Sequence, residues 1–302
     1  TRLKPGDGET DQQAIHRQLQ MSLGGAWDFD YLSHFTWTAG QALVADRYGA
    51  GRILLAGDAV HLFTPQGGFG MNTGMDDAAN LAWKLAAMVQ GWGGPALLAS
   101  YEQERRPIAI RNTGTAQGTA RHIGDIPIDD HLLQKGPAGD AARREAGAAF
   151  GQLTEEFASL GIQLGARYDS SAIIWHDGAA PPPDDPYHYQ PSSIPGGRCP
   201  HLWLEPGQRS LYDGFGRGFT LLCLGAAAEA DGLAASARRR GVPLHVLPVD
   251  HPAARDLYET NFVLVRPDFH VAWRGNAIAE QGDAILAHVT GWKSAQQGKH
   301  EG

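Results

Sequence analysis

Residues 57–72 combine side-chain types and a spacing that suit ligand binding. Asp58 follows a short apolar run at 52–56, and three glycines lie within 67–70. Ligands of open α/β sheets bind at the carboxyl ends of strands, where a carboxylate can accept hydrogen bonds from ligand hydroxyl groups. Glycines allow backbone N–H groups to approach a ligand closely. The pattern therefore predicts a loop that contacts a polar, hydroxyl-bearing ligand.

A helix predicted after this loop, over 76–89, adds a second binding feature. Its N-terminus carries unpaired N–H groups and a partial positive charge, so it stabilises negative charge on a bound group. Asp76 and Asp77 would fill its first turn, where the helix dipole favours acidic residues. A lone Gly-Asp or Gly-Gly-x-Gly also occurs in loops that bind nothing, so the hypothesis rests on the whole loop, 57–74.

The elements around the loop predict an α/β protein. Asp11 is the expected N-cap of a helix over 11–23, and 35–45 has the alternation of a half-buried antiparallel strand. The run at 52–56 is predicted to be a buried strand. Pro107 is expected to kink or end a helix that starts at 95. The further helices are predicted over 95–105, with the pattern resuming to 121, and over 138–160.

The last part of the chain predicts a separate α/β unit. Apolar runs at 219–224 and 243–248 flank a helix over 226–240, which is typical of two parallel strands and their crossover. Strands over 261–266 and 269–273 follow as a hairpin, and a helix over 283–289 closes the unit. The proline-rich segment 179–186 is predicted to be an irregular linker.

Composition excludes several classes of protein. The 302 residues carry 25 Lys and Arg against 33 Asp and Glu, a net charge of −8 that disfavours nucleic-acid binding. The dense basic run at 238–240 fits a solvated helix end. No apolar stretch approaches the ~20 residues that span a bilayer, so we expect no membrane span and a cytoplasmic location.

Cys199 and Cys223 form neither a CxxC nor a zinc-binding pattern. We therefore expect both to be buried as small apolar side chains, and we predict no metal site. A thiol oxidoreductase is the disfavoured alternative, because the missing CxxC removes its redox pair.

One segment resembles a motif of a known family. It is the second FAD-binding motif of the single-component FAD-dependent aromatic hydroxylases, the phenol-type class A flavoprotein monooxygenases, and here it covers 57–72 together with Asp77-Ala78 and Asn80 to Leu85. Segments 195–201 and 265–274 resemble the thioredoxin-like C-terminal domain of that family. The resemblance covers residues from about 35 to 275. It implies three parts: the C-terminal part of a Rossmann-like FAD-binding and substrate domain (1–123), a helical and Pro-rich linker region (124–193) and a thioredoxin-like domain (194–302).

Roles for individual residues follow from the resemblance. Asp58 would bind the ribityl chain of FAD, and Pro65 would lie beside the isoalloxazine ring, near the place where oxygen reacts. The backbone groups that would contact the flavin near its N1 and C2=O edge belong to Gly68, Gly70, Met71 and Asn72.

The implied activity is hydroxylation of a phenolic substrate with NAD(P)H and O₂. NAD(P)H would reduce FAD, and O₂ would form a flavin C4a-hydroperoxide that transfers an OH group to the ring. A homodimer is also implied. The family's N-terminal G-x-G-x-x-G turn has no counterpart here, since the nearest candidate, at 6–8, lacks a preceding strand and a third glycine.

The chain therefore resembles the C-terminal half of such an enzyme, and we expect it to need the N-terminal half as a partner and to hold FAD weakly alone. The alternative is a truncated, non-catalytic relic that acts as a binding or assembly module.

Three assignments stay open at the sequence level. His61 is either an acid/base or, as the motif favours, a structural residue. Trp37 either lines a substrate pocket or packs in the core. The charged cluster in the helix after residue 95 either binds an anion or, as helical spacing favours, forms charge pairs within the helix; its members are Glu102, Glu104, Arg105 and Arg106.

Overall fold

The computed structural model describes residues 12–30, 32–33, 41–126, 129–151, 158–225 and 230–292. The chain divides into two compact units, 1–38 and 39–302. The first unit contains α1 (Gln12–Ser22), which confirms the helix predicted over 11–23. Asp11, its expected N-cap, lies outside the described residues, as does Trp37.

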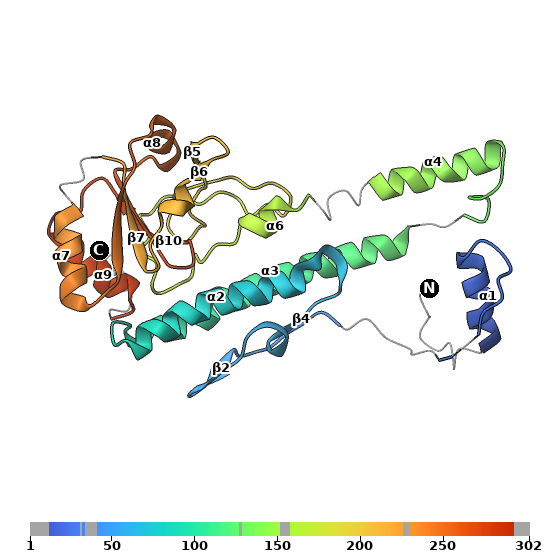
Figure 1. The fold of residues 1–302 in the computed structure, drawn as a ribbon, viewed down its shortest axis with the longest axis horizontal. Helices are drawn as coiled ribbons and strands as arrows, with labels where there is room; N and C mark the ends of the chain where they lie inside the picture. Colours follow the sequence, from blue (N-terminus) through green and yellow to red (C-terminus); the bar gives the residue numbers. More distant parts are fainter. Residues whose placement is uncertain are drawn as a thin grey trace, which may run out of the picture. The chain divides into compact units, whose positions relative to one another are not determined.

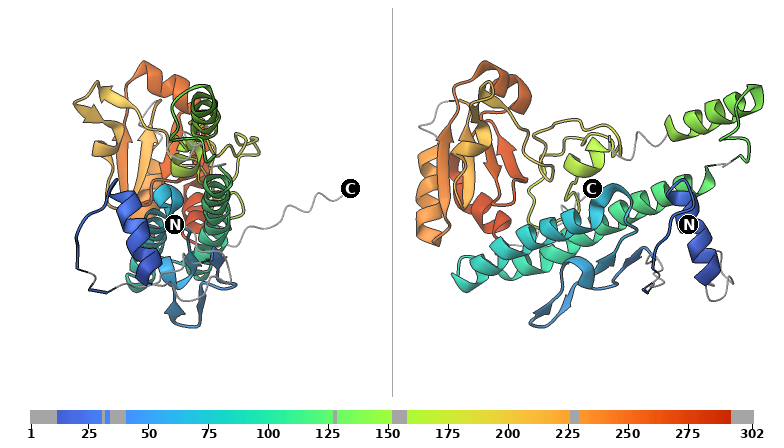
Figure 2. Two further views of the ribbon diagram at one scale, coloured as in Figure 1. Left: turned by 90° about the vertical axis from the view of Figure 1, so that its right-hand side faces the viewer. Right: turned by 45° about the vertical axis from the view of Figure 1, so that its right-hand side comes forward.

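Two long helices form the centre of the second unit. α2 (Phe69–Val89) and α3 (Pro95–Asp125) run antiparallel, side by side (Figures 1 and 2). The prediction that Pro107 kinks or ends the helix is wrong in one respect, because α3 continues through it without a break. Pro107 removes one helix hydrogen bond, but Ile108, the next residue, and Tyr101, six residues earlier in α3, are buried and hold the helix in place.

α2 begins seven residues earlier than predicted, so the loop assigned to 57–74 ends at Gly68. Gly74 lies inside the helix because the backbone of Gly57 packs against it. A Cβ atom at Gly74 would lie 3.2 Å from the Gly57 Cα. The glycines that suggested a loop therefore allow a helix to approach a turn closely.

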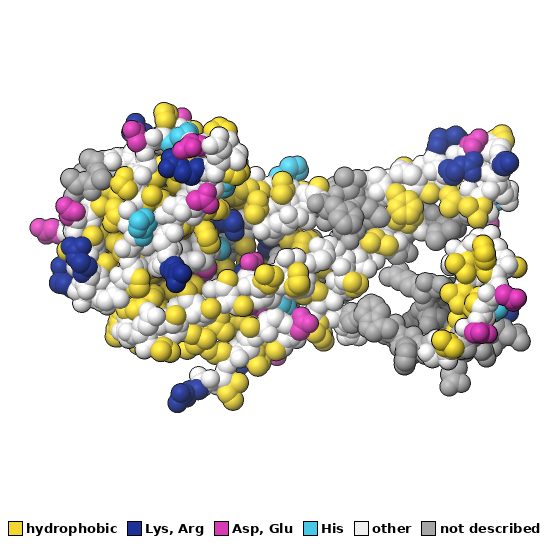
Figure 3. Space-filling view, in the orientation of Figure 1, with side chains coloured by type: hydrophobic (Ala, Val, Ile, Leu, Met, Phe, Trp, Pro, Cys, Tyr) yellow, Lys and Arg dark blue, Asp and Glu magenta, His cyan; other side chains and the backbone are white. Residues whose placement is uncertain are grey.

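The strands before α2 are short. β1 (Leu43–Val44) pairs antiparallel with β4 (His61–Leu62), and β2 (Gly49–Ala50) pairs with β3 (Ile53–Leu54). The prediction of a buried strand over 52–56 is wrong, since the Ile53 side chain is 71% exposed. Among the described residues only β2 pairs with β3, so the apolar residues of β3 lie at the surface. Hydrophobic side chains are visible over this hairpin and the helix pair in Figure 3.

The C-terminal sheet has the strand order β10-β9-β7-β8. β7 (Phe219–Cys223) and β8 (Leu244–Pro248) are parallel and are joined through α7 (Ala230–Arg240). β9 (Phe262–Val265) and β10 (Val271–Gly275) form the antiparallel hairpin that was predicted. The strand–helix–strand unit, the hairpin and the α/β class are thus confirmed.

Helices cover this sheet on both faces. α7 and α9 (Gly282–Val289) pack on one face and α8 (Pro252–Tyr258) contributes to the core of the other. Trp83 of α2 and Trp92 join the first of these cores, with ring centroids 5.8 and 6.3 Å from that of Phe219. The helix pair and the sheet therefore share one hydrophobic core.

The segment between the helix pair and the sheet includes α4 (Pro137–Gly151) and α6 (Leu160–Leu164); residues 152–157 of the helix predicted over 138–160 lie outside the described part. The stretch 179–186 has no regular structure, as predicted, but Asp184 accepts hydrogen bonds from Arg111 of α3. No helix in the described part is long and apolar enough to cross a membrane. The remaining elements are β5 (Trp203–Glu205), β6 (Arg209–Ser210), η1 (Gly57–Ala59), η2 (Gln66–Gly68), η3 (Leu211–Gly214) and η5 (Ala279–Gln281).

Candidate functional site

The turn that carries Asp58 is anchored to α2 from behind. Gly57 adopts φ 60°, and its N–H donates a hydrogen bond to Oδ2 of Asp77 at 3.1 Å. Asp58 follows in η1 and its side chain is exposed. The apolar run that was predicted to deliver Asp58 as a buried strand does not do so. A 3₁₀ turn held by α2 positions the carboxylate instead.

The second part of the site is the N-terminus of α2. Gly67 and Gly68 adopt φ 74° and 65°, and Gly68 is the N-cap without a side-chain cap. Helix geometry leaves the N–H groups of Gly70 and Met71 in the first turn without intrahelical acceptors. The Asn72 side chain donates to the Gly68 carbonyl at 2.8 Å. These groups meet at one helix end, whose N–H donors suit an anion or a carbonyl oxygen.

The predicted site residues lie largely at the surface. Asp58, Pro65, Gly68 and Asn72 are exposed, and the Met71 side chain is 73% exposed. Pro65 directly precedes η2 with φ −67°. The helix end gathers four of the predicted residues, while Asp58 lies on the separate turn that packs against α2 at Gly74.

A buried carboxylate, Asp77, holds the two parts together. Its Oδ2 lies 2.7 Å from His61 Nε2, and its Oδ1 accepts from Arg105 Nε at 2.8 Å. Burial alone would raise the pKa of Asp77, but the hydrogen bonds from His61 and Arg105 outweigh it and hold that pKa below its ordinary value. The expectation that Asp77 lies in the first turn of the helix, where the helix dipole favours acidic residues, is wrong because α2 starts eight residues before Asp77.

His61 supports the loop from beneath. It is 1% exposed and its Nε2 is committed to Asp77. Its ring also packs edge-on against Phe63, with centroids 5.1 Å apart. A histidine enclosed in this way holds the turn in place, and the geometry favours the structural reading of His61 over an acid/base at the surface.

A second buried carboxylate, Glu104, joins α3 to α2 and to the C-terminal sheet. It accepts hydrogen bonds from Lys84 Nζ at 2.7 Å and from the two Nη atoms of Arg266 at 2.7 and 2.8 Å. The side chains of all three residues are 0% exposed. Burial raises the pKa of Glu104, but Arg266 and Lys84 outweigh burial and hold it well below its usual range.

The C-terminal hairpin completes this cluster. Asp268 accepts from Arg266, and its Oδ2 also accepts from Trp83 Nε1 at 3.2 Å. His270 stacks on Tyr168 with ring centroids 4.0 Å apart. Burial lowers the pKa of His270 to about 4, so this ring is neutral at pH 7. Burial likewise lowers the pKa of Lys84 to about 8, although Glu104 opposes the shift.

These contacts correct the favoured assignment for the charged residues of α3. Glu104 and Arg105 pair with α2 and with the C-terminal hairpin, and not within their own helix. Glu102 accepts a hydrogen bond from the Tyr48 backbone N–H, and Arg106 donates to the Ala45 carbonyl. Helical spacing alone could not show this, since each side chain has a partner far away in the sequence.

Sequence reasoning missed the members of this buried cluster that lie outside α3, namely Lys84, Tyr168, Arg266 and Asp268. One signal was available: Lys84 stands inside the apolar run Leu81 to Leu85, where an exposed lysine would break the pattern. Cys199 and Cys223 are buried as predicted. In the described part of the chain, no group of three or more His, Cys, Asp or Glu residues could hold a metal ion.

Comparison with known proteins accounts for both the loop and the sheet. The family described as "FAD binding domain" matches residues 5–116, and the family described as "Aromatic-ring hydroxylase, C-terminal" matches residues 192–294. The chain belongs to the FAD-dependent aromatic-ring hydroxylase family. The resemblance expected from residues 57–72 and 265–274 is thereby confirmed.

Individual relatives support the same assignment. The chain is 35% identical to the FAD-dependent monooxygenase apdD of Emericella nidulans, over 90% of this chain and 46% of that protein. It is 32% identical to phenol 2-monooxygenase of a Pseudomonas species, over 92% and 51%. The solved structure of the flavin-dependent monooxygenase PieE with FAD and substrate is similar over 95% of this chain and 56% of that one, with 28% identity and a TM-score of 0.78. The chain thus spans about half the length of the relatives it matches.

Proposed function

We propose that this hydroxylase-family chain is the flavin-edge and C-terminal part of an FAD-dependent monooxygenase that hydroxylates a phenolic compound with NAD(P)H and O₂. The observation that carries the proposal is the N-terminus of α2. It is exposed, it has no side-chain cap, and two left-handed glycines lead into it. Family membership and the phenol-hydroxylating relative support the reaction class.

The residues present fit a flavin. A carboxylate on an exposed turn, at Asp58, is an acceptor that suits the hydroxyl groups of a ribityl chain. The α2 terminus offers N–H donors to a carbonyl or an anionic ring edge. When bound, FAD would supply the transfer of electrons from NAD(P)H and the activation of O₂. The residues assigned to the edge of its ring are Gly68, Gly70, Met71 and Asn72.

The chain's own groups perform three tasks in this proposal. The helix terminus stabilises negative charge at the ring edge, since its donors are fixed before the charge develops. Asp77 holds the turn of Asp58 through the Gly57 N–H, and Arg105 keeps Asp77 ionised. Pro65 presents a ring without an N–H donor and with a fixed φ, so it forms a rigid wall beside the loop.

A flavin titration tests the assigned residues. The 302-residue chain is titrated with riboflavin, FMN and FAD by flavin fluorescence. Because the assigned contacts are to the ribityl chain and the ring, riboflavin and FMN should bind within about threefold of FAD. Asp58→Ala should weaken all three about tenfold or more, the effect of losing a hydrogen bond to a charged group. Asp250→Ala, which removes another exposed carboxylate, is the matched control and should change nothing.

Either of two results would remove the assignment. One is equal flavin affinity of Asp58→Ala and wild type. The other is FAD binding far tighter than riboflavin binding, which would place the contacts on the adenosine diphosphate part.

The activity needs its own assay. The chain is co-expressed with the N-terminal half of phenol 2-monooxygenase, and oxidation of NADH and of NADPH is followed with a panel of phenols. Phenol-dependent NAD(P)H oxidation with formation of a hydroxylated product is the expected result. Flavin binding without any product would leave a binding module as the function of this chain.

A further inference from the structure

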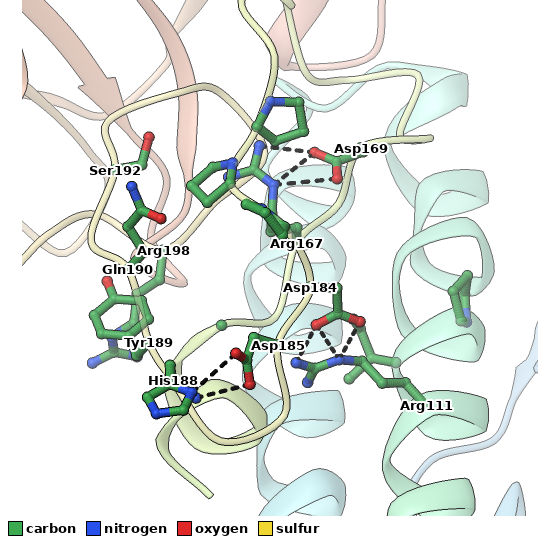
Figure 4. A pocket seen from close by; sticks show the side chains of 16 residues that line it. Arg111, Arg167, Asp169, Asp184, Asp185, His188, Tyr189, Gln190, Ser192 and Arg198 are labelled. Carbon is green, nitrogen blue, oxygen red and sulfur yellow. Dashed lines mark hydrogen bonds and ion pairs between the residues drawn. The ribbon is translucent and has the colours of Figure 1, made fainter.

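A cavity of about 430 Å³ lies between α3 and two loop segments, 165–169 and 181–192 (Figure 4). None of the residues that line it belongs to the flavin loop, 57–72. The cavity is therefore a separate place on the molecule, and the function proposed above does not use it.

Most charges around the cavity are neutralised by partners within it. Arg111 makes hydrogen bonds to both oxygens of Asp184, and Arg167 does the same with Asp169. His188 Nδ1 lies 3.0 Å from an oxygen of Asp185. Figure 4 shows these three pairs as dashed lines. Their carboxylates are occupied, so they neither attract a second cation nor need one.

Arg198 is the exception among the charged residues that line the cavity. In the described part of the chain it forms no ion pair within 4 Å. Its guanidinium carbon lies 5.6 Å from the ring centroid of Tyr212 and 6.0 Å from that of Phe269. The guanidinium also makes a side-chain hydrogen bond to Tyr212. Stacking uses only its faces, so the other N–H groups at its edge can donate to a ligand. Burial raises the pKa of Asp76 and the positive charge of Arg198 opposes this rise to a small extent, but the ion pair of Asp76 is with Arg105.

The lining of the cavity also includes apolar residues. Pro107 and Ile108 of α3 form one side, and the three consecutive prolines 181–183 belong to the loop opposite. Proline rings are rigid, so such a wall favours a flat ligand over a flexible chain. Gln190 and Ser192 add neutral polar groups at the lining. The cavity combines one available cation with a surface suited to a planar apolar group.

We propose that this cavity binds a small planar carboxylate of the benzoate type, with its carboxylate on the edge of the Arg198 guanidinium and its ring against the prolines. A guanidinium donates two parallel hydrogen bonds to a carboxylate, which gives both direction and strength. The proposal also gives a role to Arg198 of the motif 195–201, which the flavin site does not use. It does not depend on FAD binding.

Calorimetry with benzoate tests the site on the 302-residue chain. Wild type should bind one benzoate per chain with saturation, and Arg198→Met should weaken binding at least tenfold. Arg198→Lys, which restores the charge, should recover part of the affinity. Arg217→Met removes an exposed arginine outside the cavity and gives the same change in net charge; its affinity should stay within about twofold of wild type.

Two further ligands and one further variant separate the site from its alternatives. Benzyl alcohol has the same ring without the charge, and inorganic phosphate has charge without the ring; both should bind at least tenfold more weakly than benzoate. Gln190→Trp should reduce benzoate affinity by filling the cavity. Because this variant keeps Arg198, it still tests the site if Arg198→Met does not fold. Absence of saturable benzoate binding, unchanged affinity in Arg198→Met, or equal affinity for phosphate would overturn the proposal.

Discussion

Arg266 of the C-terminal hairpin donates two hydrogen bonds to the two oxygens of Glu104 in α3, at 2.7 and 2.8 Å, across 162 positions of sequence. Both side chains are fully buried. A guanidinium and a carboxylate placed fork to fork fix distance and angle at once. The pair joins the segment that matches the FAD-binding family to the one that matches the hydroxylase C-terminal family.

Removing one partner of this pair should destabilise the protein strongly. Arg266→Met leaves Glu104 buried with Lys84 as its remaining cation, and breaking a buried pair on one side costs about 3–5 kcal/mol. Urea unfolding followed by circular dichroism measures the loss. Adding Glu104→Gln to Arg266→Met should not recover the loss, because Lys84 then loses its carboxylate partner and Asp268 still lacks Arg266.

The matched control is Arg209→Met, which removes one side of the exposed Arg209–Glu205 pair. Exposed pairs contribute about 0–1 kcal/mol, so its stability should stay within about 1 kcal/mol of wild type. A loss in Arg209→Met equal to that in Arg266→Met would contradict the burial argument.

His270 should make the fold sensitive to mild acid. Its pKa is lowered to about 4 by burial, against about 6.5 in the unfolded chain. Between these values the unfolded chain binds a proton that the folded chain does not, so stability is lost as pH falls from 6.5 to 4. The loss attributable to His270 reaches up to about 3 kcal/mol.

Unfolding measured at pH 7, 5.5 and 4.5 in wild type and His270→Gln checks this expectation. The variant should show a flatter pH dependence in this window. His188→Gln replaces a histidine whose side chain is 85% exposed and should keep the wild-type slope. A wild-type slope in His270→Gln would show that other groups cause the acid sensitivity.

Two glycines in helices should respond oppositely to alanine. Gly118 in α3 has open space where a Cβ would be, so Gly118→Ala should stabilise the fold by about 0.5–1 kcal/mol through helix propensity. A Cβ at Gly74 would press on the Gly57 backbone. In thermal unfolding, Gly74→Ala should therefore be less stable than Gly118→Ala by at least about 1 kcal/mol. Gly74→Ala should also weaken riboflavin binding, because it displaces the turn that carries Asp58.

Both cysteines should be inert in the folded chain. Burial raises the pKa of Cys199 to about 12 and that of Cys223 to about 11, so neither forms the reactive thiolate at pH 8. Ellman's reagent should find no reactive thiol in native protein and two in urea. Rapid modification of either cysteine in native protein would contradict the burial and would reopen the thiol oxidoreductase alternative.

Local patterns predicted the elements that depend on local physics. The strand–helix–strand unit of β7, α7 and β8 follows from apolar runs of strand length around an amphipathic segment. The start of α2 did not follow, because glycines at 70 and 74 are typical of loops. Both are helical here: Gly74 packs against the Gly57 backbone and Gly70 lies beside the Phe63 side chain, contacts that local sequence patterns do not show.

The sequence by itself determined the family, through the order of residue types in 57–72 and 265–274, and the positions that would face a flavin stay a prediction from it. Only the tertiary structure decided what the charged residues do. Glu104 and Arg105 have the spacing of solvated helix residues, and the apolar run around Lys84 does not show which residue Lys84 pairs with. The partners of these three residues lie 20 to 162 positions away. The free energy of a buried ion pair depends on burial and on partner geometry, and both exist only once α2, α3 and the C-terminal hairpin have packed together.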